Sequence, residues 1–115
     1  MYSADGLNKA TPTGSTGYSL SAGGPVADPT MELFIASPIC AHMLHARPAL
    51  MSSNKPIVLS ISDELGTDAL VTVDGNIREH ITVGDEVIIK KSKYTADIIK
   101  FGDQSFYDIL IDKLK

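Results

Sequence analysis

The sequence lacks the features that would place it in several large classes of protein. It has a single cysteine, Cys40, so no disulfide can form within the chain and no cysteine cluster is available to hold structural zinc. Its ten lysines and arginines are scattered and its net charge is -4, which argues against a nucleic-acid partner. No apolar run approaches the roughly 20 residues that span a bilayer, and the first ten residues contain no apolar core of signal-peptide length. We therefore expect a cytoplasmic protein that binds neither nucleic acid nor a membrane.

The length and composition of the chain suit one compact domain, because 115 residues of which 43% are hydrophobic can bury a core. In its second half, apolar and polar residues alternate as in half-buried strands, first at 57–62 and again near Leu70–Val73. The Asp74–Gly75 pair then predicts a tight hairpin whose two turn residues have positive φ. Glu86–Lys91 and Thr95–Phe101 are predicted to form a further pair of antiparallel strands.

The last residues of the chain have the spacing of a short helix. Three apolar residues lie four apart, at Phe106, Leu110 and Leu114. Ser105 is the expected N-cap and Asp108 stands at the capping-box position. We expect this helix to pack on the sheet.

The first half is less regular. Residues 31–35 are mostly apolar and predict a strand, although a buried helical turn of this length has the same pattern. Pro38 and Pro48 bracket a segment that we expect to be a loop with a brief helical turn, because each proline removes a backbone donor.

The most distinctive stretch is Ala10–Pro25, which reads ATPTGSTGYSLSAGGP and holds four glycines and seven hydroxyl side chains. Thr13, Ser15 or Thr16 is expected to cap a short helix that ends at Gly23. Such a bend offers backbone N–H groups and hydroxyls to phosphate or ribose oxygens. It is not a Walker loop, because no lysine follows its glycines. On composition alone, a capped helix in a glycine-rich turn with no ligand is the favoured interpretation.

Several segments along the chain match the sequence motifs of one protein family. They are DGL at Asp5–Leu7, the run Ala10–Pro29, SPICAH with ARP at Ala46–Pro48, VTVDG at Val71–Gly75 and the closing FYDILIDKLK. Together they resemble the C-terminal domain of NAD kinase over nearly the whole chain. The sixteen consecutive positions of the central stretch read as a member of that family would.

The resemblance implies an all-β fold, a two-sheet β-sandwich with a short helix after the TGSTGY motif and a short C-terminal helix. Residues 1–115 would be the NAD-binding and oligomerising domain. Members of the family form dimers or tetramers. The family transfers the terminal phosphate of ATP, or of polyphosphate in some members, to the 2'-hydroxyl of the adenosine ribose of NAD and yields NADP. It requires a divalent metal, Mg²⁺, which no residue of this chain is expected to bind.

The chain lacks the family's catalytic Gly-Gly-Asp-Gly motif, since Gly23–Gly24 is followed by proline and neither Asp5–Gly6 nor Asp74–Gly75 follows a glycine pair. The family's Asn-Glu adenine-binding dipeptide is also absent. We therefore expect a C-terminal domain without its N-terminal catalytic half, with no catalytic residue and no activity alone. The alternative is a non-catalytic dinucleotide-binding or assembly module. A lipid kinase shares the general architecture, but the TGSTGYSLSAGGP wording argues against it.

The resemblance also assigns contacts with the dinucleotide. Asp5 lies thirteen positions before Tyr18, as in the family, and Tyr18 would stack on adenine. Thr16 and Ser21 would hydrogen-bond ribose or phosphate oxygens. The expected NAD-binding residues are Asp5, Thr13, Thr16, Gly17, Tyr18, Ser19, Leu20, Ser21, Cys40 and Asn76. Without the resemblance, Tyr18 reads as a half-buried core ring and Asp5 as a turn residue.

The remaining candidates lie outside the central stretch. Cys40 aligns near the nicotinamide end of the ligand, and Asn76 stands where many relatives have the longer glutamine. His42 and His45 lie three apart without a third ligand, so no metal site is expected there. Arg47 is expected to fix a loop or a subunit contact.

One departure from the family lies just before the central stretch. Asn8–Lys9 occupy two positions that relatives fill with branched apolar residues. Their side chains must either turn outward or raise the free energy of the folded state by being buried.

Overall fold

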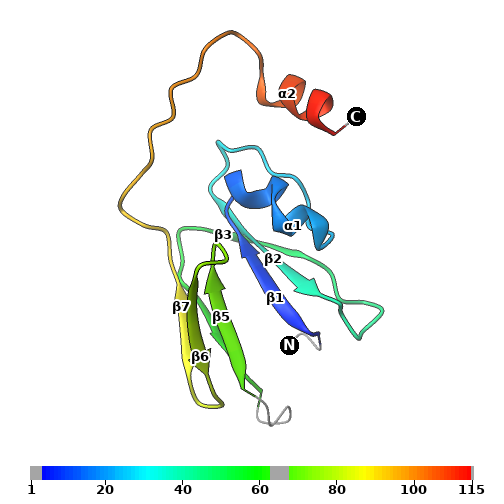
Figure 1. Ribbon diagram of the computed structural model, residues 1–115, viewed down its shortest axis with the longest axis vertical. Coiled ribbons are helices and arrows are strands. Elements are labelled where there is room, and N and C mark those ends of the chain that lie inside the picture. The colour runs from blue at the N-terminus through cyan, green and yellow to red at the C-terminus, as the bar shows by residue number, and fades with distance from the viewer. Residues whose placement is uncertain (1–3, 63–67, 115) are drawn as a thin grey trace. The chain divides into compact units, whose positions relative to one another are not determined.

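The computed structural model describes residues 4–62 and 68–114, which form two units. The first unit contains residues 4–54 and 93–114, and the second contains residues 55–62 and 68–92. The strands form three antiparallel sheets and the helices are few and short, as Figure 1 shows. The all-β class expected from the sequence is therefore confirmed.

The sheet of the first unit has three strands in the order β1 (Gly6–Ala10), β2 (Leu33–Ile39) and β3 (Ala49–Ser52). The predicted strand near residues 31–35 is confirmed, although it begins later and runs through Pro38. Pro38 is tolerated because β3 pairs with β2 only as far as Ala36, so Pro38 has a strand on one side only.

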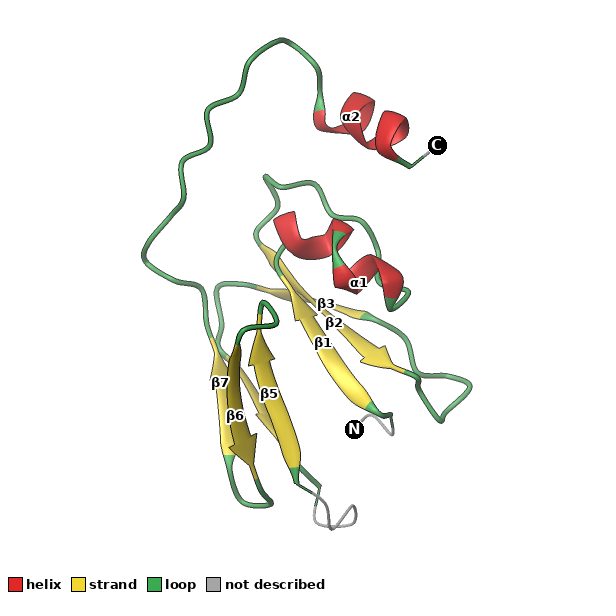
Figure 2. Cartoon of the chain, viewed as in Figure 1, coloured by secondary structure: helices red, strands yellow, loops and turns green. Residues whose placement is uncertain are grey.

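Two short helices join β1 to β2 and pack on one face of this sheet, as Figure 2 shows. They are the 3-10 helix η1 (Thr13–Thr16) and α1 (Tyr18–Ser21). The core on this face consists of Ala10, Ala27 and Ile35, with Leu33 packed against it. The predicted short helix is thus confirmed, and Gly23 follows it with a φ of +84°.

The predicted hydroxyl cap is wrong. The N-cap residues are Pro12 for η1 and Gly17 for α1, and neither helix has a side-chain cap. The Ser15 hydroxyl is instead fully buried, where it accepts a hydrogen bond from the Ala27 N–H at 3.0 Å. A buried hydroxyl must be satisfied, so it joins η1 to the chain that returns to the sheet.

The second unit consists of two strand pairs. The β5 (Ala69–Val73) and β6 (Ile77–Ile81) pair is the predicted hairpin, and its turn residues Asp74 and Gly75 have φ values of 48° and 76°. The other pair is formed by β4 (Ile57–Ser60) and β7 (Glu86–Ile89). No residue of β4 or β7 is buried, and the half-buried positions alternate along both strands.

The predicted pairing of Glu86–Lys91 with Thr95–Phe101 is wrong, because β7 pairs with β4 and Thr95–Phe101 contains no strand. The β4–β7 register places Ile57 opposite Ile89 and Leu59 opposite Val87. The apolar positions of both strands therefore share one half-buried face, which is the arrangement that stabilises a strand pair.

The C-terminal helix α2 (Phe106–Lys113) is confirmed together with its capping box. The Asp108 N–H donates to Ser105 Oγ at 3.2 Å, and the Ser105 N–H donates to Asp108 Oδ2 at 3.0 Å. The expected packing of this helix is wrong, because none of its residues is buried and Phe106 and Leu110 are only half-buried. Among the described residues, no helix has the length and apolar character needed to cross a membrane.

Candidate functional site

The central stretch presents its polar groups at the surface. Thr13, Thr16 and Ser21 are exposed, and 61% of Tyr18 is accessible. The core position considered for Tyr18 is therefore wrong. Tyr18 is the first residue of α1, and Gly17, the N-cap of that helix, is also exposed. The arrangement leaves an aromatic face and three hydroxyl groups open to a ligand.

Two serines beside this exposed bend are buried, and their hydroxyls have no hydrogen-bond partner among the described residues. Ser19 lies in the middle of α1 and is 1% exposed, and Ser37 of β2 is fully buried. A Cβ added to Gly24 would lie 2.5 Å from Ser19 Oγ and 2.7 Å from Ser37 Oγ. The chain after α1 can therefore approach the sheet only because residue 24 is glycine. Leu20, the next residue of α1, is half-buried.

Asp5 lies immediately before β1, next to the end of β2. Its backbone N–H donates to the Ile39 carbonyl at 2.9 Å. Its Oδ1 lies 2.9 Å from His42 Nε2, and the two side chains are 63% and 60% exposed, respectively. Sequence reasoning did not select His42 as a partner of Asp5. The fold brings them together because β1 and β2 are antiparallel, with Gly6 opposite Ile39.

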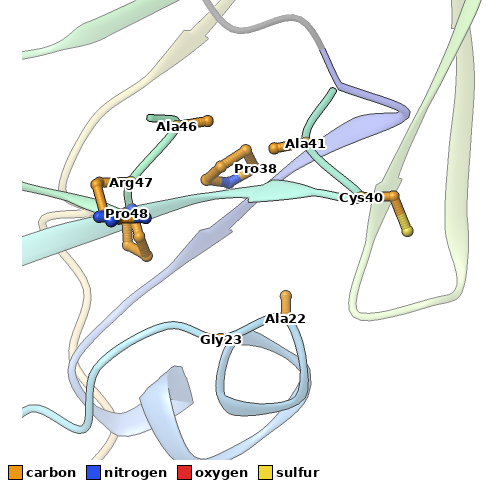
Figure 3. Close-up of a pocket in the computed structure, with 8 residues that line it drawn as sticks. All are labelled: Ala22, Gly23, Pro38, Cys40, Ala41, Ala46, Arg47 and Pro48. Atoms are coloured by element: carbon orange, nitrogen blue, oxygen red, sulfur yellow. The ribbon is translucent and has the colours of Figure 1, made fainter. Parts of the chain in front are cut away.

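An open pocket of about 370 Å³ lies beside the end of β2 and the end of α1. Figure 3 shows its lining residues, which come from the end of α1, the end of β2 and the loop that follows. Cys40 is among them, is exposed, and has a φ of 49°. Arg47 lines the same pocket between Ala46 and Pro48. The structure thus brings Cys40 and Arg47 together in the first unit.

Asn76 is the one predicted site residue in the second unit. It follows the hairpin turn between β5 and β6, it is exposed, and its N–H donates to the Val73 carbonyl at 3.0 Å. Among residues 4–62 and 68–114, no three His, Cys, Asp or Glu side chains gather in a group that could hold a metal ion.

Asn8 and Lys9 of β1 are half-buried, and the polar ends of both side chains are buried rather than turned to the solvent. Lys9 Nζ lies 3.9 Å from the centre of the Phe34 ring, and neither Lys9 Nζ nor Asn8 Oδ1 has a hydrogen-bond partner. Burial lowers the pKa of Lys9 to about 8, because the charged amine loses its water. The folded state is therefore penalised at this strand.

Comparison with known proteins identifies the family. A family model described as the ATP-NAD kinase C-terminal domain matches residues 1–101. The NAD kinase of Carboxydothermus hydrogenoformans is 46% identical over 114 residues, which is 99% of this chain and 40% of that protein. The NAD kinase of Acetivibrio thermocellus is 39% identical over 114 residues, which is 99% of this chain and 39% of that protein. The chain thus spans about two fifths of the length of these relatives.

Solved structures give the same result. A crystal structure of yeast NADH kinase complexed with NADH has a TM-score of 0.68 and 38% identity, over 76% of this chain and 25% of that one. An NAD kinase from Archaeoglobus fulgidus in complex with ATP has a TM-score of 0.65 and 35% identity, over 79% of this chain and 34% of that one. The chain belongs to the ATP-NAD kinase family and carries its C-terminal domain.

Proposed function

We propose that this chain is the dinucleotide-binding part of an NAD kinase, which phosphorylates the 2'-hydroxyl of the adenosine ribose of NAD with ATP or polyphosphate and yields NADP. The observation that carries the proposal is the match of nearly the whole chain to proteins named NAD kinase. The exposed aromatic and hydroxyl groups of the central stretch support it, because they suit a nucleoside.

In this proposal Tyr18 stacks on adenine. An aromatic face against a base contributes roughly 1–3 kcal/mol, and 61% of Tyr18 is accessible for such contact. Thr13, Thr16 and Ser21 supply hydroxyls to ribose and phosphate oxygens, and the exposed Gly17 lets the ligand approach the backbone.

The other residues expected to bind NAD have the following roles in this proposal. Asp5 binds the dinucleotide with its carboxylate oriented by His42 at 2.9 Å. Ser19 is buried and Leu20 is half-buried, and both support the segment that carries the ligand contacts. Cys40 contributes near the nicotinamide end, where it lines the open pocket, and Asn76 contributes an amide from the second unit.

Phosphoryl transfer needs positioning, charge neutralisation and a carboxylate that orients the attacking hydroxyl. This chain supplies the positioning. The described side chains do not fit a magnesium ion, because no three possible ligands gather among them. We therefore assign the ion and the catalytic carboxylate to a Gly-Gly-Asp-Gly domain outside this sequence. We also propose a cytoplasmic dimer or tetramer.

The proposal is tested by assaying NADP formation from NAD and ATP. The 115-residue chain alone should form no NADP. Co-expression with the amino-terminal part of the Carboxydothermus hydrogenoformans NAD kinase, which this chain does not match, should restore activity. Turnover by the chain alone would contradict the proposal that the catalytic carboxylate lies outside this sequence. NAD binding without restored turnover would favour a non-catalytic binding module.

A further inference from the structure

Three polar side chains meet beneath the central stretch, on the face of the sheet that η1 and α1 cover. Ser37 of β2 is fully buried, Ser19 of α1 is 1% exposed, and the side-chain oxygen of the half-buried Asn8 in β1 is itself buried. None of the three side-chain oxygens has a hydrogen-bond partner among the described residues. Because a buried polar atom without a partner raises the free energy of the folded state, three at one place point to a ligand that pairs them.

The register of the sheet places Asn8 beside Ser37. The two residues are directly opposite each other in the antiparallel β1–β2 pair, so their side chains share one face and their Cβ atoms lie about 4.5–5.5 Å apart. Ala10 and Ile35 are two residues farther along the strands and belong to the core beneath η1 and α1, so they identify the face. Lys9 points to the opposite face, and its amine therefore lies away from this cluster.

Gly24 brings Ser19 to the same place. A Cβ built on Gly24 would lie 2.5 Å from Ser19 Oγ and 2.7 Å from Ser37 Oγ, which limits the distance between the two oxygens to the sum of these, about 5.2 Å. The two hydroxyls are not hydrogen-bonded to each other. A water molecule at about 2.8 Å from each of two oxygens spans a distance of up to roughly 5.5 Å. The separation of the two serine oxygens therefore suits a single water molecule between them.

We propose that Asn8, Ser19 and Ser37 bind one buried water molecule, which joins α1 to the sheet. The water donates a hydrogen bond to Asn8 Oδ1 and accepts one from each serine hydroxyl, so every atom of the cluster gains a partner. Three hydrogen bonds are the usual number for a buried water in a globular protein. Since Ser19 directly follows Tyr18, the water holds the backbone that carries the exposed ring. The site is independent of the function proposed above.

Two other arrangements of the same atoms satisfy the cluster less well. A metal ion on the three oxygens would lie about 2.3–2.6 Å from each, as calcium does, but the cluster contains no carboxylate to balance its charge. A direct hydrogen bond from the Asn8 amide to Ser37 Oγ would leave Ser19 Oγ buried and unpaired. A water molecule pairs all three atoms without introducing a charge.

A crystal structure of the 115-residue chain, at a resolution that shows ordered water, tests the site directly. We expect a density peak about 2.7–3.0 Å from Asn8 Oδ1 and from both serine oxygens. The proposal would be overturned by no peak there, by a peak about 2.3–2.6 Å from all three oxygens, or by a direct contact of the Asn8 amide with Ser37 Oγ. The measurement uses the wild-type chain, so it does not require any variant to fold.

A double-mutant cycle tests the bridge in solution. Asn8→Val and Ser19→Ala should each raise the equilibrium constant of unfolding in urea about tenfold, because each leaves the remaining buried groups without their shared partner. The double variant should also raise it about tenfold rather than a hundredfold, since the same bridge is lost only once. Effects that multiply would overturn the proposal, as would a more stable Asn8→Val variant.

Ser53→Ala is the matched control for this cycle. Ser53 is 6% exposed and its hydroxyl also has no hydrogen-bond partner among the described residues, but it follows β3, which β2 separates from β1. Its effect should therefore multiply with that of Asn8→Val. Coupling of Ser53→Ala to Asn8→Val as strong as that of Ser19→Ala would overturn the assignment of a shared water.

Discussion

Replacing Lys9 with methionine should stabilise this protein, and the gain should depend on pH. Methionine has nearly the length of the lysine side chain but carries no charge. In the wild-type chain, the Lys9 amine is buried over the Phe34 ring without a hydrogen-bond partner. Removing the charge should therefore remove a penalty while the apolar stem keeps its packing.

The pKa of Lys9 gives the size of this penalty. Burial lowers it from 10.5 to about 8, and each pKa unit is worth about 1.36 kcal/mol, so the full shift corresponds to about 3.4 kcal/mol. The side chain is only half-buried and the Phe34 ring attracts the ammonium, so we expect a gain of about 2 kcal/mol at pH 7.

The sign of the pH dependence follows from the direction of the shift. Between about pH 8 and 10.5, the unfolded chain keeps a proton on Lys9 that the folded chain has released. The wild-type protein therefore becomes more stable as the pH rises through this range. The advantage of Lys9→Met should be complete below pH 8 and fall to about a quarter of its value at pH 10.

Urea unfolding followed by far-UV circular dichroism, at pH 7 and pH 10, measures both values. Lys55→Met is the matched control, because Lys55 is exposed and its replacement should leave the free energy of unfolding nearly unchanged at both pH values. The reasoning would be refuted by a Lys9→Met variant that is less stable than wild type at pH 7, or whose gain is the same at pH 10.

Three further predictions concern the bend, α2 and the Asp5 contact. Gly24→Ala should lower the free energy of unfolding by about 2 kcal/mol in urea, because its Cβ would lie 2.5 Å from a serine hydroxyl oxygen; an unchanged midpoint would contradict this. The hydrogen bonds of the N-cap serine lower the pKa of Asp108 from 3.8, so helicity of α2 should persist at pH 4 and decline as Asp108 is protonated at lower pH; decline already at pH 5 by circular dichroism would be inconsistent. His42→Ala should weaken NAD binding about threefold in a calorimetric titration, since Asp5 loses an exposed partner, whereas His45→Ala should leave it unchanged.

The features that sequence alone predicted correctly are local. The Asp74–Gly75 turn follows from the tolerance of these residues for positive φ, and the α2 start follows from the reciprocal bonds of Ser105 and Asp108. The glycine after α1 likewise ends that helix as expected. In each case the interactions that determine the structure lie within a few residues of one another, so the local sequence is enough to predict it.

The features that sequence alone did not predict depend on residues far apart in the chain. The choice of β4 as the partner of β7 is made by matching apolar faces across residues 57–89, which alternation within one strand does not reveal. The burial of the Ser15 hydroxyl depends on Ala27, and the contact of Asp5 with His42 depends on the register of β1 and β2. From the sequence, His42 is considered as part of the SPICAH motif and as a rejected metal ligand with His45, but not as a partner of Asp5.

The measurement that tests the account most directly is a calorimetric titration of NAD into the 115-residue chain and two tyrosine variants. Tyr18 and Tyr107 are 61% and 58% exposed, so their replacement by alanine removes similar amounts of exposed aromatic surface. We predict that Tyr18→Ala weakens NAD binding by about tenfold or more, the loss of a stacked base, while Tyr107→Ala leaves it unchanged. Equal affinity of wild type and Tyr18→Ala would contradict the claim that this exposed bend holds the adenosine of a dinucleotide.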